Sequence, residues 1–92
     1  MVASHAMIGF PNSMRSFDED AGIIRFSGYD GVKEIRFVLE APALEQFAKL
    51  DRSPDTDYLG AFDSFREQID AAAVRAYKRT GKPVIRLTIA DF

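Results

Sequence analysis

The sequence predicts an α+β domain in which a small, mainly antiparallel, three-stranded sheet packs against a short and a long helix, in the order ββααβ. Three observations predict it. Residues 23–39 alternate apolar and polar side chains on both sides of a turn, which is typical of a β-hairpin. Residues 56–80 repeat apolar side chains at helical spacing, and residues 84–90 alternate again as a final strand.

The turn of the hairpin lies in the stretch "GYDG". Asp30 and Gly31 together favour a two-residue type I′ turn, because both central positions of that turn need a positive φ. Such a turn pairs Phe26 with Ile35 and leaves the apolar residues of both strands on one face. The sequence therefore predicts a hairpin that closes at Asp30 and Gly31.

Two helices are predicted after the hairpin. Pro42 suits the first turn of a short helix over residues 42–49. A long helix over residues 56–80 ends at Gly81, with basic side chains in its last turn as the helix dipole favours. The apolar stripe of this helix recurs every three or four positions: Tyr58, Phe62, Phe65, Ile69, Ala72 and Ala76.

The chain before the hairpin gives weaker signals. Residues 8–10 suit a very short strand, and "RSFDEDAG" (residues 15–22) reads as an irregular polar segment. We expect residues 1–6 to be an added leader or a disordered start, with Met7 as the native start, and residues 7–92 to be a single globular domain.

Composition narrows the classes of function. The chain has 92 residues, a net charge of −2 and no cysteine, which excludes disulfides, thiolate zinc sites and a cysteine nucleophile. The only histidine, His5, lies in the expected leader. No serine elbow, phosphate loop or dinucleotide fingerprint occurs, and Tyr58 and Tyr77 read as core aromatics with a hydroxyl at the surface. We therefore predict no enzyme, no catalytic residue, no cofactor, no metal and no membrane span, in a cytoplasmic protein.

One surface stands out as a candidate contact site. Arg25, Arg36 and Arg86 each fall at an outward position of a different strand, and the predicted turn sets Arg25 directly opposite Arg36. Like charges placed so are unfavourable, and guanidinium groups bind anions well. Two explanations stay open. The arginines bind an anion or an acidic partner, or the neighbouring carboxylates of Glu34, Glu40 or Asp20 neutralise them.

The same outward face carries apolar side chains at Ile23, Val38 and Val84. A sheet with one layer of helices should have a mostly polar second face. Two interpretations stay open: an interface for a second copy or a protein partner, or a face covered by the N-terminal segment with Phe10 and Phe17.

Three stretches carry a family resemblance: "FPNSMRSFDEDAGIIRFSGYDGVKEIRFVLE", "AFDSFREQIDAAAVRAYKRTGK" and the closing "LTIADF". With them the chain resembles, from Met7 to Phe92, a short bacterial family known as domain of unknown function 1488. The resemblance implies a bacterial cytoplasmic protein. It implies no activity, cofactor, partner or functional residue.

We therefore expect a non-enzymatic protein-interaction or regulatory module that acts through Arg25, Arg36 and Arg86, as a homodimer or with another protein. The alternative, which we do not favour, is a nucleic-acid or anion-binding module that uses the same arginines with Arg75 and Arg79.

Overall fold

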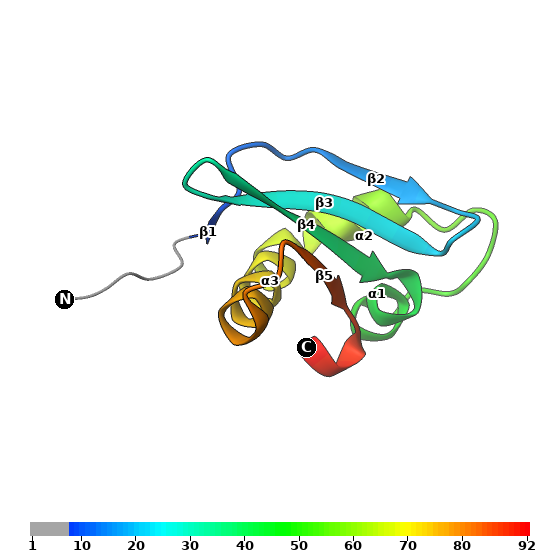
Figure 1. Cartoon of the computed structure of the whole chain (residues 1–92). Helices are drawn as coiled ribbons and strands as arrows, with labels where there is room; N and C mark the ends of the chain where they lie inside the picture. The colour runs from blue at the N-terminus through cyan, green and yellow to red at the C-terminus, as the bar shows by residue number, and fades with distance from the viewer. Residues whose placement is uncertain (1–7) are drawn as a thin grey trace.

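The sheet is built around the hairpin that the sequence predicts. In the computed structural model, which describes residues 8–92, β3 (Ile23–Asp30) pairs antiparallel with β4 (Lys33–Glu40). β5 (Val84–Leu87) lies on the other side of β4, while β1 (Ile8–Gly9) and β2 (Arg15–Asp18) both pair with β3 (Figure 1). The α+β class is confirmed, but the sheet has five strands. The expectation for residues 1–6 lies outside the described residues.

β5 runs parallel to β4, so the sheet is mixed. Three α-helices between residues 41 and 80 connect β4 to β5. A long helical crossover of this kind lets the second strand run in the same direction as the first. The predicted strand 84–90 is too long, because Thr88 begins a 3₁₀ turn, η1 (Ile89–Asp91). Thr88 and Asp91 form a capping box there, in which Asp91 Oδ2 accepts the Thr88 N–H at 2.8 Å.

The prediction that residues 15–22 are irregular is wrong for the first half of this segment. Arg15–Asp18 forms β2 and extends, after a gap, the edge that β1 begins on β3. Contacts remote in sequence hold it: Arg15 makes two hydrogen bonds to Asp63, at 2.8 and 2.9 Å, and the Phe17 ring packs 4.7 Å from that of Tyr58. The local sequence of this short polar strand contains no sign of either contact.

The register of the hairpin differs from the predicted one by two residues. Asp30 pairs with Lys33, so the two turn residues are Gly31 and Val32. Gly31 has a φ of 63° and Val32 is not among the residues with positive φ, as in a type II′ turn. Because side chains alternate with a period of two, a shift of two leaves each one on its predicted face. It does change which residues lie opposite each other.

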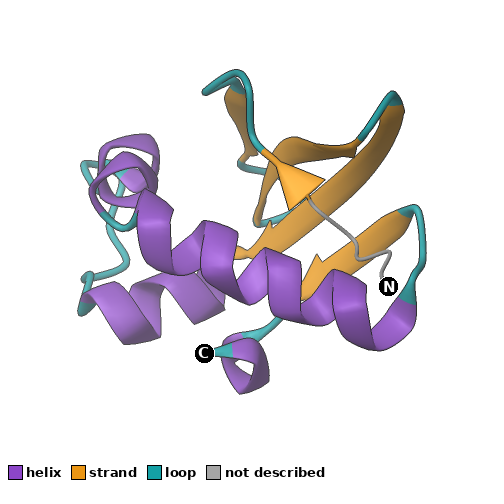
Figure 2. Ribbon diagram, turned by 90° about the vertical axis from the view of Figure 1, so that its left-hand side faces the viewer, coloured by secondary structure: helices purple, strands orange, loops and turns teal. Residues whose placement is uncertain are grey.

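The helices form one layer against the sheet, as Figure 2 shows. α1 (Ala41–Ala48) matches the predicted short helix. The predicted helix 56–80 is divided into α2 (Tyr58–Ser64) and α3 (Arg66–Thr80), with a bend at Phe65, whose φ is −107°. The bend directs Phe65 toward Phe47, ring to ring at 5.5 Å, while Phe62 meets Phe26 at 5.1 Å.

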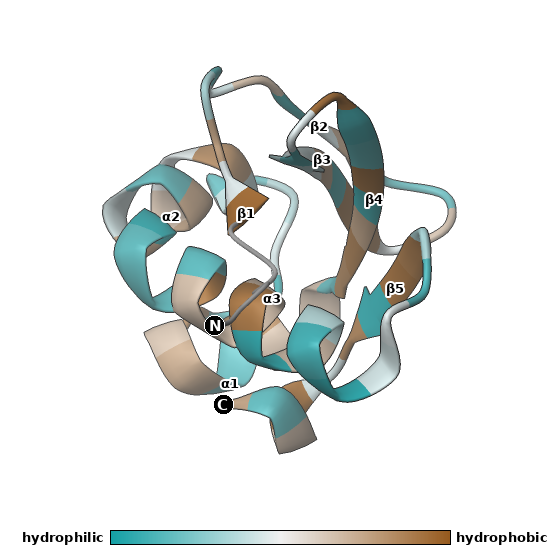
Figure 3. Ribbon diagram, turned by 60° about the vertical axis from the view of Figure 1, so that its left-hand side comes forward, coloured by the Kyte–Doolittle hydropathy of each residue, from teal (hydrophilic) through white to brown (hydrophobic). Residues whose placement is uncertain are grey.

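The core lies between the helices and the inner face of the sheet. Figure 3 shows hydrophilic and hydrophobic colours changing along β4 and β5, where one face is buried and the other is not. The largest fully buried side chains are Ile24, Ile35, Phe37, Leu39, Leu44, Phe62, Ile69 and Leu87. The strand residues among them lie on the face that the alternation predicts to be apolar, and Phe62 and Ile69 belong to the predicted helical stripe. Among residues 8–92, no helix packs on the outer face of the sheet.

Candidate functional site

The outer sheet face is the part of β3, β4 and β5 that turns away from the helices. Its central row runs from Arg25 through Val38 to Arg86, and the next row runs from Ser27 through Arg36 to Val84. The three predicted arginines thus share one face, as expected. The prediction that Arg25 lies directly opposite Arg36 is wrong, because the turn is displaced by two residues.

Each of these arginines has a carboxylate beside it. Nη1 of Arg25 lies 3.0 Å from Asp18, Nε of Arg86 lies 2.7 Å from Glu40, and Nε of Arg36 lies 3.7 Å from Glu34. The partners are two of the predicted acids, together with Asp18 in place of Asp20. The pKa of Asp18 is lowered, first by the Ala21 N–H and then by Arg25. Three positive and three negative groups leave the face near neutrality.

A hollow of about 590 Å³ opens on this face between β4 and the gap that separates β1 from β2. Arg25 and Arg36 line it; Arg86 does not. Two large apolar side chains on its rim are exposed, Met14 to 76% and Val84 to 56%. Exposed apolar side chains beside arginine are typical of protein interfaces.

Residues 8–18 lie along the edge of the sheet, and neither Phe10 nor Phe17 covers the outer sheet face. The ring of Phe10 packs 6.2 Å from that of Phe26, which belongs to the core, and Phe17 packs on Tyr58 of α2. Both rings therefore lie on the helical side. Of the two interpretations of this face, covering by Phe10 and Phe17 is ruled out among residues 8–92.

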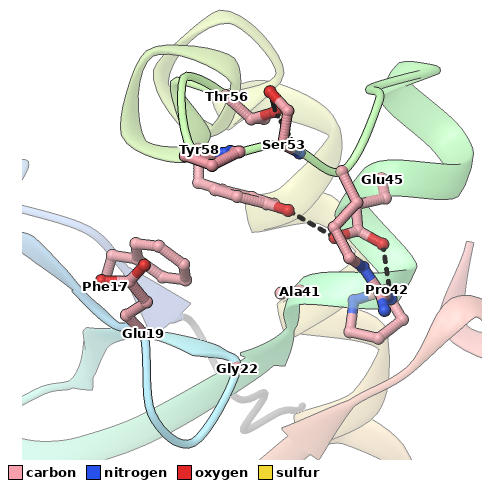
Figure 4. A pocket seen from close by; sticks show the side chains of 11 residues that line it. Phe17, Glu19, Gly22, Ala41, Pro42, Glu45, Ser53, Thr56 and Tyr58 are labelled. Carbon is pink, nitrogen blue, oxygen red and sulfur yellow. Dashed lines mark hydrogen bonds and ion pairs between the residues drawn. The ribbon is translucent and has the colours of Figure 1, made fainter.

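A second hollow, of about 530 Å³, lies between the turn that joins β2 to β3 and the start of α1 (Figure 4). We call it the Glu45 pocket, and its walls are mainly apolar. Tyr58 and Glu45 lie on one side of it and Phe17 and Glu19 on the other. Its remaining lining residues are Gly22, Ala41, Pro42, Arg52, Ser53, Pro54 and Thr56.

Glu45 is the polar centre of this pocket. Its side chain is only 14% exposed, and its carboxylate accepts the Tyr58 hydroxyl at 2.5 Å. Arg52 donates to both oxygens, from Nε at 3.3 Å and from Nη2 at 3.1 Å. These donors, Arg52 first, lower the pKa of Glu45, and the Glu45 carboxylate raises the pKa of Tyr58. Glu45 is therefore ionised at neutral pH.

The sequence did not indicate this pocket. Glu45 and Arg52 are separated by the end of α1, where Lys49 turns the chain with a φ of 57°, so no helical or strand period relates them. Tyr58 was predicted to be a core aromatic with a surface hydroxyl; it is 8% exposed and its hydroxyl binds Glu45. The other such residue, Tyr77, donates to Asp30 at 2.8 Å.

Two arginines near the end of α3 contact Asp91. Arg79 lies 3.0 Å from Asp91, and Arg75 donates to the backbone carbonyl of Asp91 at 2.9 Å. Within residues 8–92, no three histidine, aspartate or glutamate side chains gather closely enough to hold a metal ion. None of the helices described here is long and apolar enough to cross a membrane.

Comparisons with known proteins agree with this fold. The crystal structure of a Shewanella loihica PV-4 protein of unknown function, from the DUF1488 family, superposes on this chain with a TM-score of 0.78. The two are 18% identical over 92% of this chain and 96% of that one. A search of curated proteins finds no match. The model of the family described as "Protein of unknown function (DUF1488)" matches residues 8–85, and the chain belongs to this family.

Proposed function

We propose that this domain is a non-enzymatic protein-interaction module of the bacterial cytoplasm, and that the outer sheet face receives its protein partner. The observation that carries the proposal is the composition of this face. Met14 and Val84 expose apolar surface on the rim of a hollow that Arg25 and Arg36 line. Arginine next to exposed apolar side chains supplies both affinity and orientation in protein interfaces.

The ion pairs of the face favour a protein over a polyanion. Arg25, Arg36 and Arg86 are each balanced by a neighbouring carboxylate, so the face offers no net positive charge to nucleic acid. A partner that presents its own acidic and basic groups can instead exchange ion pairs with this face. A second copy of the chain carries such a set.

Two measurements test the proposal. Sedimentation velocity of the purified chain over a wide concentration range shows whether a second copy binds. Affinity capture from the bacterium of origin, read by mass spectrometry, shows whether another protein binds. The informative variants are Val84→Asp and the double charge reversal Arg25→Glu with Arg36→Glu. Lys78→Glu, an exposed charge reversal on α3, is the matched control.

We expect at least one interaction that both face variants remove and Lys78→Glu leaves intact, while circular dichroism shows that all remain folded. A chain that is monomeric at every concentration, and whose captured proteins are the same for all variants, contradicts the proposal. Retention of nucleic acid at low salt that weakens steeply as salt rises would instead support the anion-binding alternative.

A further inference from the structure

We propose that the Glu45 pocket is a binding site for a guanidinium group carried on a short aliphatic chain. The group can belong to a small molecule or to an arginine side chain at the surface of another protein. This site is separate from the outer sheet face, and the inference does not depend on the function proposed for that face.

The shape and walls of the pocket suit such a ligand. Its volume of about 530 Å³ lies within the range of small-molecule sites, which are lined mainly by apolar groups around a few fixed polar ones. Phe17 and Tyr58 supply aromatic surface, and Pro42 and Pro54 supply aliphatic surface. Aromatic rings attract a guanidinium group, and apolar walls accept the methylene chain behind it.

The carboxylate at the centre is already prepared for a guanidinium group. Tyr58 holds one oxygen of Glu45 with a hydrogen bond, which fixes the orientation of the carboxylate. The contacts from Arg52 reach both oxygens, so the carboxylate faces a planar fork of donors in the two-point arrangement that guanidinium groups favour. The protein's own Arg52 thus shows which chemical group this carboxylate accepts.

Arg52 is held loosely enough to be exchanged. Its side chain is 73% exposed and comes from the loop between α1 and α2. Water screens an ion pair with so exposed a partner and leaves it weak, so an incoming guanidinium group can replace Arg52 easily. Arg52 is the only cationic side chain among the described lining residues. Once it leaves, Glu45 and Glu19 give the pocket two negative charges.

Titrations followed by ¹H–¹⁵N correlation spectra test the inference, with butylguanidinium as the probe. Butylammonium and butanol keep the four-carbon chain. Butylammonium keeps the positive charge but lacks the planar fork of donors, and butanol lacks both. Wild type, Arg52→Ala and Glu45→Gln are compared, with Glu67→Gln on the exposed side of α3 as the matched control. Glu45→Gln keeps an oxygen that can accept from Tyr58, and the thermal midpoint of each variant reports its folding.

We expect butylguanidinium to shift the amide signals of Phe17, Gly22, Glu45 and Thr56, and to bind more tightly than butylammonium or butanol. Arg52→Ala, which removes the internal competitor, should bind up to about fivefold more tightly. Glu45→Gln should lose at least about tenfold in affinity, because the charged acceptor is gone, while Glu67→Gln binds as wild type does. Tyr58→Phe keeps the Glu45 carboxylate and should still bind butylguanidinium.

Two results would overturn the inference: no shift of these signals in Arg52→Ala, or equal binding by folded Glu45→Gln. Repeating the titration with a capped arginine dipeptide separates the two sources of the group. Tighter binding of the dipeptide than of butylguanidinium identifies a protein chain as the ligand. Weaker binding identifies a small molecule.

Discussion

Arg66 donates from Nε to Oδ1 of Asp70, one turn further along α3, at 2.8 Å, and both side chains are largely buried. The guanidinium carbon lies 5.1, 5.3 and 5.7 Å from the ring centres of Phe62, Phe26 and Phe10. Burial raises the pKa of Asp70, against the opposite effect of Arg66. Arg66 thus joins the residue that follows β1, strand β3 and helices α2 and α3 through three aromatic contacts and one ion pair.

We expect this arrangement to depend on the planar group of Arg66. Arg66→Lys keeps the charge and loses the flat contacts with the rings, and should lower the free energy of unfolding by about 1 kcal/mol. Arg66→Ala also leaves Asp70 without its partner and should cost about 2 kcal/mol or more. Urea unfolding measures both. Arg36→Ala is the control. The Arg36 side chain is 72% exposed, so its removal should change the free energy of unfolding little. Equal stability of Arg66→Ala and wild type would contradict this account.

We expect Gly28 of β3 to be needed for the close packing of Ile8 and Phe10 against this strand. A methyl group at this position would lie 2.7 Å from Cε1 of Phe10 and 2.9 Å from Cγ2 of Ile8. Gly28→Ala should therefore push these side chains away and cost about 1–3 kcal/mol. Amide hydrogen exchange of residues 8–10 should become faster as well. Gly9→Ala is the matched control, since a methyl group there meets nothing within 4 Å. If both variants unfold at the same urea concentration, the close contact at Gly28 is not real.

The Glu45 network should make stability depend on pH at both ends of the range. The folded-state pKa of Glu45 is below its ordinary value of 4.5, so its contribution is present above that value and is lost as pH falls through the lowered pKa. The folded-state pKa of Tyr58 is above its ordinary value of 10.0, so its contribution is present below pH 10.0 and is lost as pH rises through the raised pKa.

Glu45→Gln tests the link between these two groups. The hydrogen bond to the Glu45 carboxylate raises the pKa of Tyr58 first, and the charge of Glu45 adds to it. Glu45→Gln replaces that bond with a weaker one to a neutral amide and removes the charge, so the pKa of Tyr58 should fall toward 10.0. The ¹³Cζ chemical shift of Tyr58, followed through an alkaline titration, reports this pKa. The pKa of Tyr77, which Asp30 raises, serves as the internal control and should stay as in wild type. If the pKa of Tyr58 is the same in Glu45→Gln as in wild type, Glu45 is not the hydrogen-bond partner of Tyr58 in solution.

The turn of the hairpin gives a direct check of register. Gly31 has a φ of 63°, so Gly31→Ala should cost about 1 kcal/mol. Val32 is fully exposed, and Val32→Ala should remain within about 0.5 kcal/mol of wild type. Nuclear Overhauser contacts should pair Phe26 with Phe37 across the ladder. A pairing of Phe26 with Ile35 would restore the type I′ turn at Asp30 and Gly31 and refute the register described above.

The sequence by itself determined which face each strand buries. Alternation placed Ile24, Phe26, Ile35 and Phe37 in the core, and this assignment is confirmed although the predicted register was displaced by two residues. The physical reason is that side-chain direction repeats every two residues, so it is fixed by local pattern alone. For the same reason Arg25, Arg36 and Arg86 could be assigned to one face.

Only the tertiary structure decided which residues meet. The pairs Arg15–Asp63 and Glu45–Arg52 follow no local period, because a strand joins a helix in the first and a helix end joins a loop in the second. The 3₁₀ turn after Leu87 is different: the Thr88 to Asp91 spacing was a readable capping signal that the alternation of residues 84–90 obscured. Pairing across the fold depends on how the chain closes on itself, and the Glu45 pocket forms only there.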